Sequence, residues 1–277
     1  MMEQWHLSEC WTYPLKSAGG ILTTTARVEH RGLSNDRRWM LVELDGTFMT
    51  QRRDPKMSLI QTSLQGDTLV VQAPGMPPCD IPMQPPVEQH KSVRVWRSDV
   101  EALLVSEKVD EWFSKYIERP CHLVWMPKNV RRDVNEAYKA GEGIVSFADG
   151  YPFLLASMSS LQDLNGRLEQ GISMNRFRPN LVIEGPPAFA EDRWKKVKIG
   201  EITFAVVKPC DRCAVITIDQ TTGKRGAEPL KTLASFRRHD KRIFFGQNLI
   251  PLNEGTIKVG DLVEVLEEHD EANPPLS

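Results

Sequence analysis

Short apolar runs, each bounded by polar residues, recur in the N-terminal third of the chain. Such runs cover residues 37–44, 68–72 and 93–96, and Asp45-Gly46 after the first of them is typical of a hairpin turn. Six prolines between residues 74 and 86 predict an extended connection. Because short strands follow one another here without a helix, the pattern predicts a small β-barrel or sandwich.

Helical spacing first appears beyond residue 98. Ser106 is placed to cap a helix in which Val109, Trp112, Phe113 and Tyr116 follow at i, i+3, i+4 and i+7, and we interpret these side chains as core. Further helices are predicted around the leucines at 161, 164 and 168 and over residues 229–236. Strands are predicted at residues 121–126, 181–183, 214–218, 242–245 and 260–266, a hairpin at 197–204 and a long polar loop at 127–150.

These elements predict a mainly β fold with a few helices (α+β) in two domains. We expect a small N-terminal β-barrel domain over residues 1–97, a second, β-barrel-like domain over 98–268 and a flexible tail over 269–277.

Composition narrows the protein class. The chain has 277 residues, a net charge of −2 and 26% charged residues, so no bulk basicity indicates a nucleic-acid partner. It has no apolar run of the roughly 18 residues that a membrane span requires, and its N-terminus lacks the pattern of a signal peptide. Five cysteines suit free thiols in a reducing compartment, so we expect a cytoplasmic protein.

The motif Lys208-Pro209-Cys210-Asp211-Arg212-Cys213 lies between two apolar runs. Pro209 cannot donate to a sheet ladder, so the strand should stop or bulge there and present the cysteines on a corner. Half of a zinc site, a redox pair and two buried cysteines are the common alternatives for one CxxC. The other three cysteines and the six histidines show no ligand spacing, and the expected strand at 214–218 does not fit a thioredoxin-like helix, which weakens the first two alternatives.

Four polar clusters accompany this motif. Lys16-Ser17, before two glycines, could cradle an anion, and an arginine in residues 35–38 could bind a phosphate, although ordinary turns explain both. Asp149 lies between aromatic residues. We interpret it either as a residue that forms a turn or as an acid with a shifted pKa. Two arginines and two amides in residues 175–180 could hold a planar or anionic group.

The motifs at residues 175–180, 190–194, 208–213, 245–247 and 255–261 occur in the order typical of the MOSC domain, named for the C-terminal domain of molybdenum cofactor sulfurases. Residues 13–17 and 33–37 resemble the β-barrel domain that precedes it in amidoxime-reducing component proteins and their bacterial relatives. The resemblance spans residues 5 to 268.

This resemblance implies a molybdenum cofactor, in which a pterin dithiolene with a phosphate tail (Mo-molybdopterin) holds the metal. Cys210 matches the metal-ligating position, Cys213 matches a cysteine not assigned to the metal, and Asp149 matches an aspartate near it, which we assign to catalysis. Tyr151 stands where eukaryotic members carry a smaller hydroxyl residue. The implied cofactor-binding residues are Lys16, Ser17, Arg37, Tyr151, Arg178, Asn180, Asp211 and Arg212.

The implied activity is the reduction of N-hydroxylated small molecules such as amidoximes and hydroxylamines. No cysteine follows Cys213 to hold an iron–sulfur cluster, so we expect a separate electron-donor protein, such as a reductase, a ferredoxin-like protein or a cytochrome. Pyridoxal phosphate binding is associated with the family only as a whole, and we assign it no residue. Two alternatives stay open, namely a carrier of sulfur or molybdenum cofactor that uses Cys210 without turnover, and a zinc-binding domain.

Overall fold

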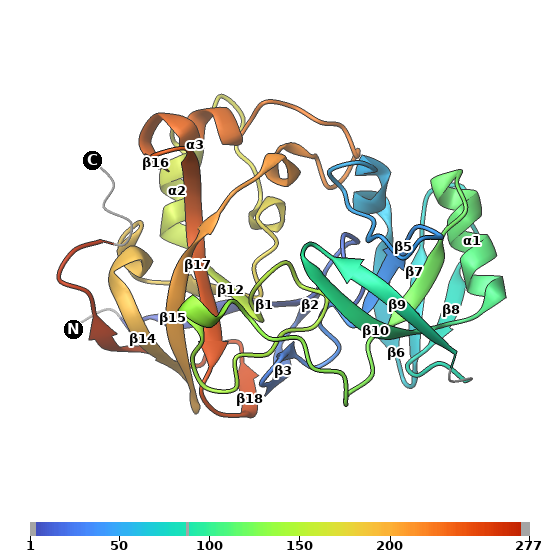
Figure 1. Cartoon of the computed structure of the whole chain (residues 1–277). Helices are drawn as coiled ribbons and strands as arrows, with labels where there is room; N and C mark the ends of the chain where they lie inside the picture. The colour runs from blue at the N-terminus through green and yellow to red at the C-terminus, as the bar shows by residue number, and fades with distance from the viewer. Residues whose placement is uncertain (1–3, 87–88, 273–277) are drawn as a thin grey trace.

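The computed structural model describes residues 4–86 and 89–272 and shows two lobes side by side (Figure 1). Most elements are strands, with three α-helices among the described residues, so the predicted fold class is confirmed. In chain order the elements are β1 (His6–Thr12), β2 (Ile21–Thr23), β3 (Thr25–Glu29), β4 (Gly32–Leu33), β5 (Trp39–Val42), η1 (Pro55–Leu59), β6 (Gln61–Gln65), β7 (Thr68–Gln72), β8 (Cys79–Pro82), β9 (His90–Val95), β10 (Ser98–Leu104), α1 (Glu107–Ile117), β11 (His122–Trp125), η2 (Glu136–Tyr138), β12 (Phe153–Ser157), α2 (Met158–Asn165), η3 (Met174–Arg176), β13 (Leu181–Glu184), η4 (Ala190–Arg193), β14 (Trp194–Ile199), β15 (Ile202–Asp211), η5 (Ala214–Thr217), α3 (Leu230–Phe236), β16 (Arg238–His239), β17 (Arg242–Pro251), β18 (Gly255–Lys258) and β19 (Val263–Glu268).

The large lobe is built on one sheet with the strand order β19-β14-β15-β17-β12-β13-β1-β2, and β16 pairs with β17. Helices α2 and α3 cover one face, where Leu161, Leu164 and Leu233 join a buried apolar cluster. The other face curves around a second core that includes Phe153 and Phe204, whose rings lie 5.2 Å apart. Because both faces are covered, the strands are held rigidly and can position side chains at their ends.

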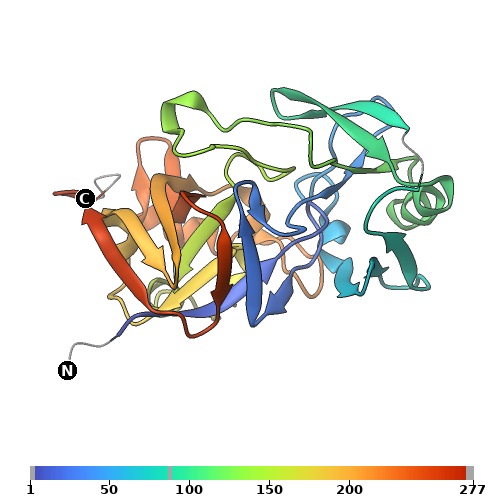
Figure 2. The same ribbon diagram turned by 90° about the horizontal axis from the view of Figure 1, so that it is seen from below.

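The first strand of the chain belongs to this large sheet. β1 pairs antiparallel with β13, with Cys10 opposite Leu181, and the first strands lie between the lobes in the view from below (Figure 2). The segment after β1 therefore meets the segment before β13, although more than 160 residues separate them in sequence.

The small lobe contains the sheets β5-β11-β10-β9 and β6-β7-β8 and helix α1. Ser106 caps α1 by accepting a hydrogen bond from the backbone N–H of Val109, as predicted. Trp112 and Phe113 are buried in the main core of this lobe together with Trp39. The interpretation of the helical aromatics as core residues is confirmed.

Three local predictions are wrong or incomplete. Residues 214–217 form the 3-10 helix η5 rather than a strand. Strand β17 begins at Arg242, and Arg212 is the last residue of the preceding segment that forms a backbone hydrogen bond with it. Residues 214–217 therefore lie beyond the end of the neighbouring strand. The proline-rich stretch contains β8, which pairs with β7, and α2 ends before Leu168. At Pro209, β15 does not stop but continues through two register shifts to Asp211, which is the predicted bulge.

The chain turns from β9 into β10 at the point where we predict the domain division, with Ser98 opposite Val95. The division after residue 97 stays a prediction. Of the predicted tail, residues 273–277 lie outside the described part, and the backbone N–H of His269 donates to the carbonyl of Arg193. No described helix is long and apolar enough to cross a membrane.

Candidate cofactor-binding site

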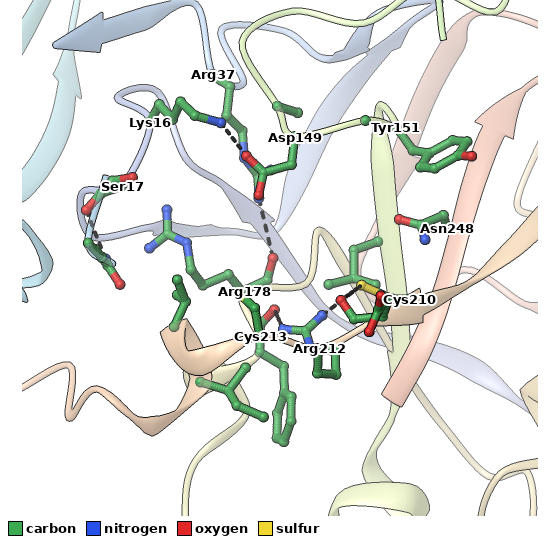
Figure 3. Close-up of a pocket in the computed structure, with 18 of the residues that line it drawn as sticks. Lys16, Ser17, Arg37, Asp149, Tyr151, Arg178, Cys210, Arg212, Cys213 and Asn248 are labelled. Carbon is green, nitrogen blue, oxygen red and sulfur yellow. Dashed lines mark hydrogen bonds and ion pairs between the residues drawn. The ribbon is translucent and has the colours of Figure 1, made fainter. Parts of the chain in front are cut away.

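The ten residues that the sequence suggests as site residues all line one cavity between the lobes (Figure 3). The antiparallel pairing of β1 with β13 brings the segment after β1 and the segment before β13 together at the cavity. There, Nη1 of Arg178 donates to the carbonyl of Ala18 at 2.6 Å. Strands β15 and β17 bring Cys210 and Asn248 to the same cavity as Leu154 of β12. Five cationic side chains and two carboxylates line the cavity, so its lining has a surplus of positive charge: Lys16, Arg37, Arg52, Arg178 and Arg212 against Asp149 and Asp211.

Lys16 and Asp149 form an ion pair that joins the turn after β1 to the loop before β12. The ammonium of Lys16 also donates to the carbonyl of Phe147 at 2.7 Å. Burial lowers the pKa of Lys16, and Asp149 partly offsets this effect. Partial burial acts to raise the pKa of Asp149, but the charge of Lys16, with help from Arg52, outweighs it and holds the pKa well below its usual range. Asp149 is therefore an ionised hydrogen-bond acceptor at neutral pH.

Arg37 is held by a buried network that the sequence did not reveal. Asp36 is 2% exposed and accepts from Nη1 of Arg37 at 2.6 Å, from the backbone N–H of Tyr13 at 2.8 Å and from Nδ2 of Asn180 at 3.2 Å. Nη1 of Arg37 also donates to Oδ1 of Asn180 at 3.0 Å. This network positions two predicted cofactor-binding residues from distant segments, and Asp36 is its centre.

Arg178 has more donor capacity than the protein uses. Its guanidinium lies 4.4 Å from the ring centroid of Tyr13, and that of Arg37 lies 4.3 Å from the same ring. Burial, together with the nearby charge of Arg37, lowers the pKa of Arg178 to about 10. No carboxylate of the described residues forms an ion pair with Arg178. A buried cation without such a partner favours the binding of an anion.

The backbone is strained at three of the predicted residues. Ser17, Arg37 and Arg178 have φ angles of 68°, 47° and 55°, in the left-handed region that favours glycine. Such conformations persist where the surrounding contacts demand them, and they cluster at functional sites. Here they turn three polar side chains of separate segments toward one cavity.

Each cysteine of the CxxC motif contacts a different guanidinium group. Nη1 of Arg212 donates to Sγ of Cys210 at 2.9 Å. Nε and Nη2 of Arg52 lie 3.3 and 3.1 Å from Sγ of Cys213. Arg52 also lies 3.5 Å from Asp149, so Cys213 is connected to the Lys16 ion pair and Cys210 is not.

Three further residues shape the site without a signal that sequence reasoning detected. Arg52 lies in the turn at residues 51–53, and its guanidinium lies 4.6 Å from the ring centroid of Trp96. Nε1 of Trp96 donates to Asp149 at 3.2 Å. Arg132 donates to the carbonyls of residues 146, 148 and 149, and so orders the end of the long polar loop. Their partners are far away in sequence, so no local pattern indicates them.

The remaining members of the polar clusters divide between cavity and surface. Tyr151 and Asp211 line the cavity, and burial raises the pKa of Tyr151 to about 12. Arg176, flagged together with Arg178, instead pairs with Asp219 at 2.8 Å and does not line the cavity. Of the two arginines in residues 175–180, only one therefore faces the site.

Comparisons with known proteins give the family of this chain. The family model of the MOSC N-terminal beta barrel domain matches residues 4–120, and that of the MOSC domain matches residues 142–264. The human mitochondrial amidoxime-reducing component 1 is 33% identical over 280 residues, which cover 94% of this chain and 82% of the human protein. This chain belongs to the amidoxime-reducing component family.

Two further relatives match most of this chain. The bovine mitochondrial amidoxime reducing component 2 is 32% identical over 276 residues, covering 93% of this chain and 82% of the bovine protein. The human molybdenum cofactor sulfurase is 31% identical over 265 residues, covering 88% of this chain but 30% of the human protein. The family resemblance inferred from the motifs is confirmed, whereas the roles of the individual residues stay predictions.

Proposed function

We propose that this member of the amidoxime-reducing component family binds a molybdenum cofactor in the cavity and reduces N-hydroxylated small molecules with electrons from a separate protein. One observation carries the proposal: a single cavity combines two thiols with a surplus of cationic side chains from both lobes. Soft thiolates suit molybdenum, and cationic donors suit a phosphate tail. The names of the relatives supply the substrate class, amidoximes.

The donor set fits such a cofactor. Lys16, Arg37 and Arg178 would hold its anionic tail, and Arg178 supports this best because its charge has no carboxylate partner among the described residues. When bound, the cofactor would supply the two-electron chemistry. The overall reaction is R–NHOH + 2e⁻ + 2H⁺ → R–NH₂ + H₂O, so the N–O bond breaks and two protons are consumed for each two electrons.

Asp149 would orient the substrate. Its lowered pKa keeps the carboxylate ionised, so it accepts a hydrogen bond from a substrate N–H or O–H group better than it donates a proton. Lys16 and Trp96 fix one carboxylate oxygen, which limits the positions that a bound substrate could take. Substrate orientation by Asp149 is therefore favoured over a role in proton relay.

Two thiols line the cavity and could bind the metal, and their contacts favour Cys213 over the expected Cys210. The resemblance assigns Cys210, whose contact is Arg212 of its own motif. Cys213 instead contacts Arg52 of the other lobe and through it reaches Asp149, the residue proposed to hold the substrate. Because the metal must lie beside both the substrate and the anchoring cations, we propose Cys213 as the ligand.

Metal and pterin analysis tests both proposals. The protein and its Cys210→Ala and Cys213→Ala variants would be purified from a host that makes the cofactor and assayed with reduced methyl viologen and benzamidoxime. We expect molybdenum and activity in the wild type, their near-complete loss in Cys213→Ala and a milder effect in Cys210→Ala. The reverse order would restore Cys210 as the ligand. Zinc without molybdenum, or molybdenum without turnover, would contradict the proposed function.

The names of the relatives also bear on the cellular compartment. The amidoxime-reducing relatives are named as mitochondrial proteins. A cytoplasmic location of this chain stays a prediction.

A further inference from the structure

A basic patch borders the cavity on the side of Cys213. It consists of Arg52 and Arg53 of the small lobe and Lys224 and Arg225 of the large lobe, and we call it the bridging patch. The side chain of Arg53 is 64% exposed, and Lys224 and Arg225 are exposed as well. Figure 1 shows the orange loop between η5 and α3, which carries the last two residues, reaching across to the blue turn η1.

Specific contacts hold the two halves of the bridging patch together. Nη2 of Arg225 donates to the backbone carbonyl of Arg52 at 2.7 Å, and the amides of Gln51 and Gln220 meet at 3.5 Å. The loop is ordered by Asp219, whose Oδ1 accepts two backbone N–H groups of the following turn. The patch is therefore a fixed surface that spans both lobes.

Half of the positive charge of the bridging patch is not neutralised. Arg52 pairs with Asp149 at 3.5 Å and Arg53 with Glu43 at 3.7 Å, which leaves the two cations of the large lobe. Arg225 donates to a carbonyl rather than a carboxylate, and neither Lys224 nor Arg225 forms an ion pair within the described residues. The nearby carboxylate of Asp219 is already paired with Arg176 at 2.8 Å. Because the whole chain has a net charge of −2, this surplus is local. A local surplus of one sign guides a complementary partner to one place on the surface.

The patch also leads directly to a thiol of the site. Arg52 connects the backbone contact of Arg225 to Sγ of Cys213, which lies 3.1 Å from Nη2 of Arg52. A protein bound on this surface would be separated from Cys213 by little more than one arginine side chain. Electron transfer between proteins requires such a short separation of the two redox centres.

We propose that the bridging patch docks an acidic one-electron carrier protein. The inference rests on the proposed function and names the electron donor by its charge and the surface it uses. Two reduced carriers bind in succession, and each leaves oxidised by one electron. Together they supply the two electrons that, with two protons, convert the N–OH group to N–H and water.

The test uses a plant-type [2Fe–2S] ferredoxin as the acidic carrier and a Lys224→Glu/Arg225→Glu variant of the cofactor-loaded protein. The matched control is Lys108→Glu/Lys115→Glu, which makes the same charge change on exposed positions of α1. Benzamidoxime reduction is driven either by reduced ferredoxin or by reduced methyl viologen, which needs no docking surface. Binding of oxidised ferredoxin is measured separately by calorimetry at low salt.

At low ionic strength we expect the patch variant to lose about tenfold in kcat/KM for ferredoxin, with the dye-driven rate within about twofold of wild type. The loss should shrink as salt screens the charges. Wild-type protein that does not bind ferredoxin, or an equal loss in the α1 control, would overturn the docking proposal. Absence of dye-driven reduction in the wild type would instead overturn the proposed function, and calorimetry would still decide on the patch.

Discussion

Replacing Asp36 by asparagine would remove one charge from the centre of the anchoring network. The carboxylate is 2% exposed and accepts from Arg37 at 2.6 Å and from the backbone of Tyr13 at 2.8 Å. Asparagine has nearly the same shape and keeps one acceptor oxygen. Its amide group would, however, place N–H donors against the guanidinium of Arg37, whose buried charge would lose its carboxylate partner.

The expected cost follows from this burial. Breaking a buried ion pair by removing one partner costs about 3–5 kcal/mol, and we expect about 3 kcal/mol because one acceptor remains. Asp99→Asn is a matched control. It removes the partner of Arg94 at a similar distance of 2.7 Å, but both side chains are more than 60% exposed. An exposed pair contributes less than about 1 kcal/mol, so this variant should be close to wild type.

Urea unfolding at pH 7, followed by tryptophan fluorescence, would measure both costs, and molybdenum content would measure the effect on the site. Asp36→Asn should lower both the free energy of unfolding and the bound metal, because Arg37 and Asn180 lose the group that positions them. Equal stability losses in the two variants would refute the reasoning. A destabilised Asp36→Asn variant with full metal content would limit Asp36 to a structural role.

Two other substitutions test the charges of buried groups. Asp149→Asn should retain molybdenum but slow benzamidoxime reduction by roughly a hundredfold, since the carboxylate that orients the substrate is lost; a wild-type rate in steady-state kinetics would exclude that role. Glu191 is 1% exposed, and burial with the charge of Asp192 raises its pKa to about 7. An unfolded glutamate ionises near pH 4.3, so native stability falls as the pH rises from there to about 7. Relative to Glu191→Gln, the free energy of unfolding of the wild type should fall by about 4 kcal/mol across this range in urea titrations; a pH-independent difference would contradict the assigned pKa.

Local sequence patterns were sufficient where neighbouring residues decide the structure. Ser106 and the aromatic spacing after it predict α1 because a cap and an apolar face are properties of a single segment. The motif likeness likewise selected ten residues that line one cavity. The strand predicted at 214–218 failed because a strand also needs a partner, and β17 offers none beyond Arg212.

The amino-acid sequence by itself determined the mainly β class, the helix α1, the family and ten of the residues that line the cavity. The tertiary structure alone decided how those residues are held, through Asp36 for Arg37, through Arg132 for the loop of Asp149, and through Arg52 for Cys213. It also favoured the second cysteine over the first as the proposed ligand, because Arg52 and Cys213 are 161 residues apart in the chain. Contacts of this kind depend on how two lobes close on each other, and a single sequence records no such distance.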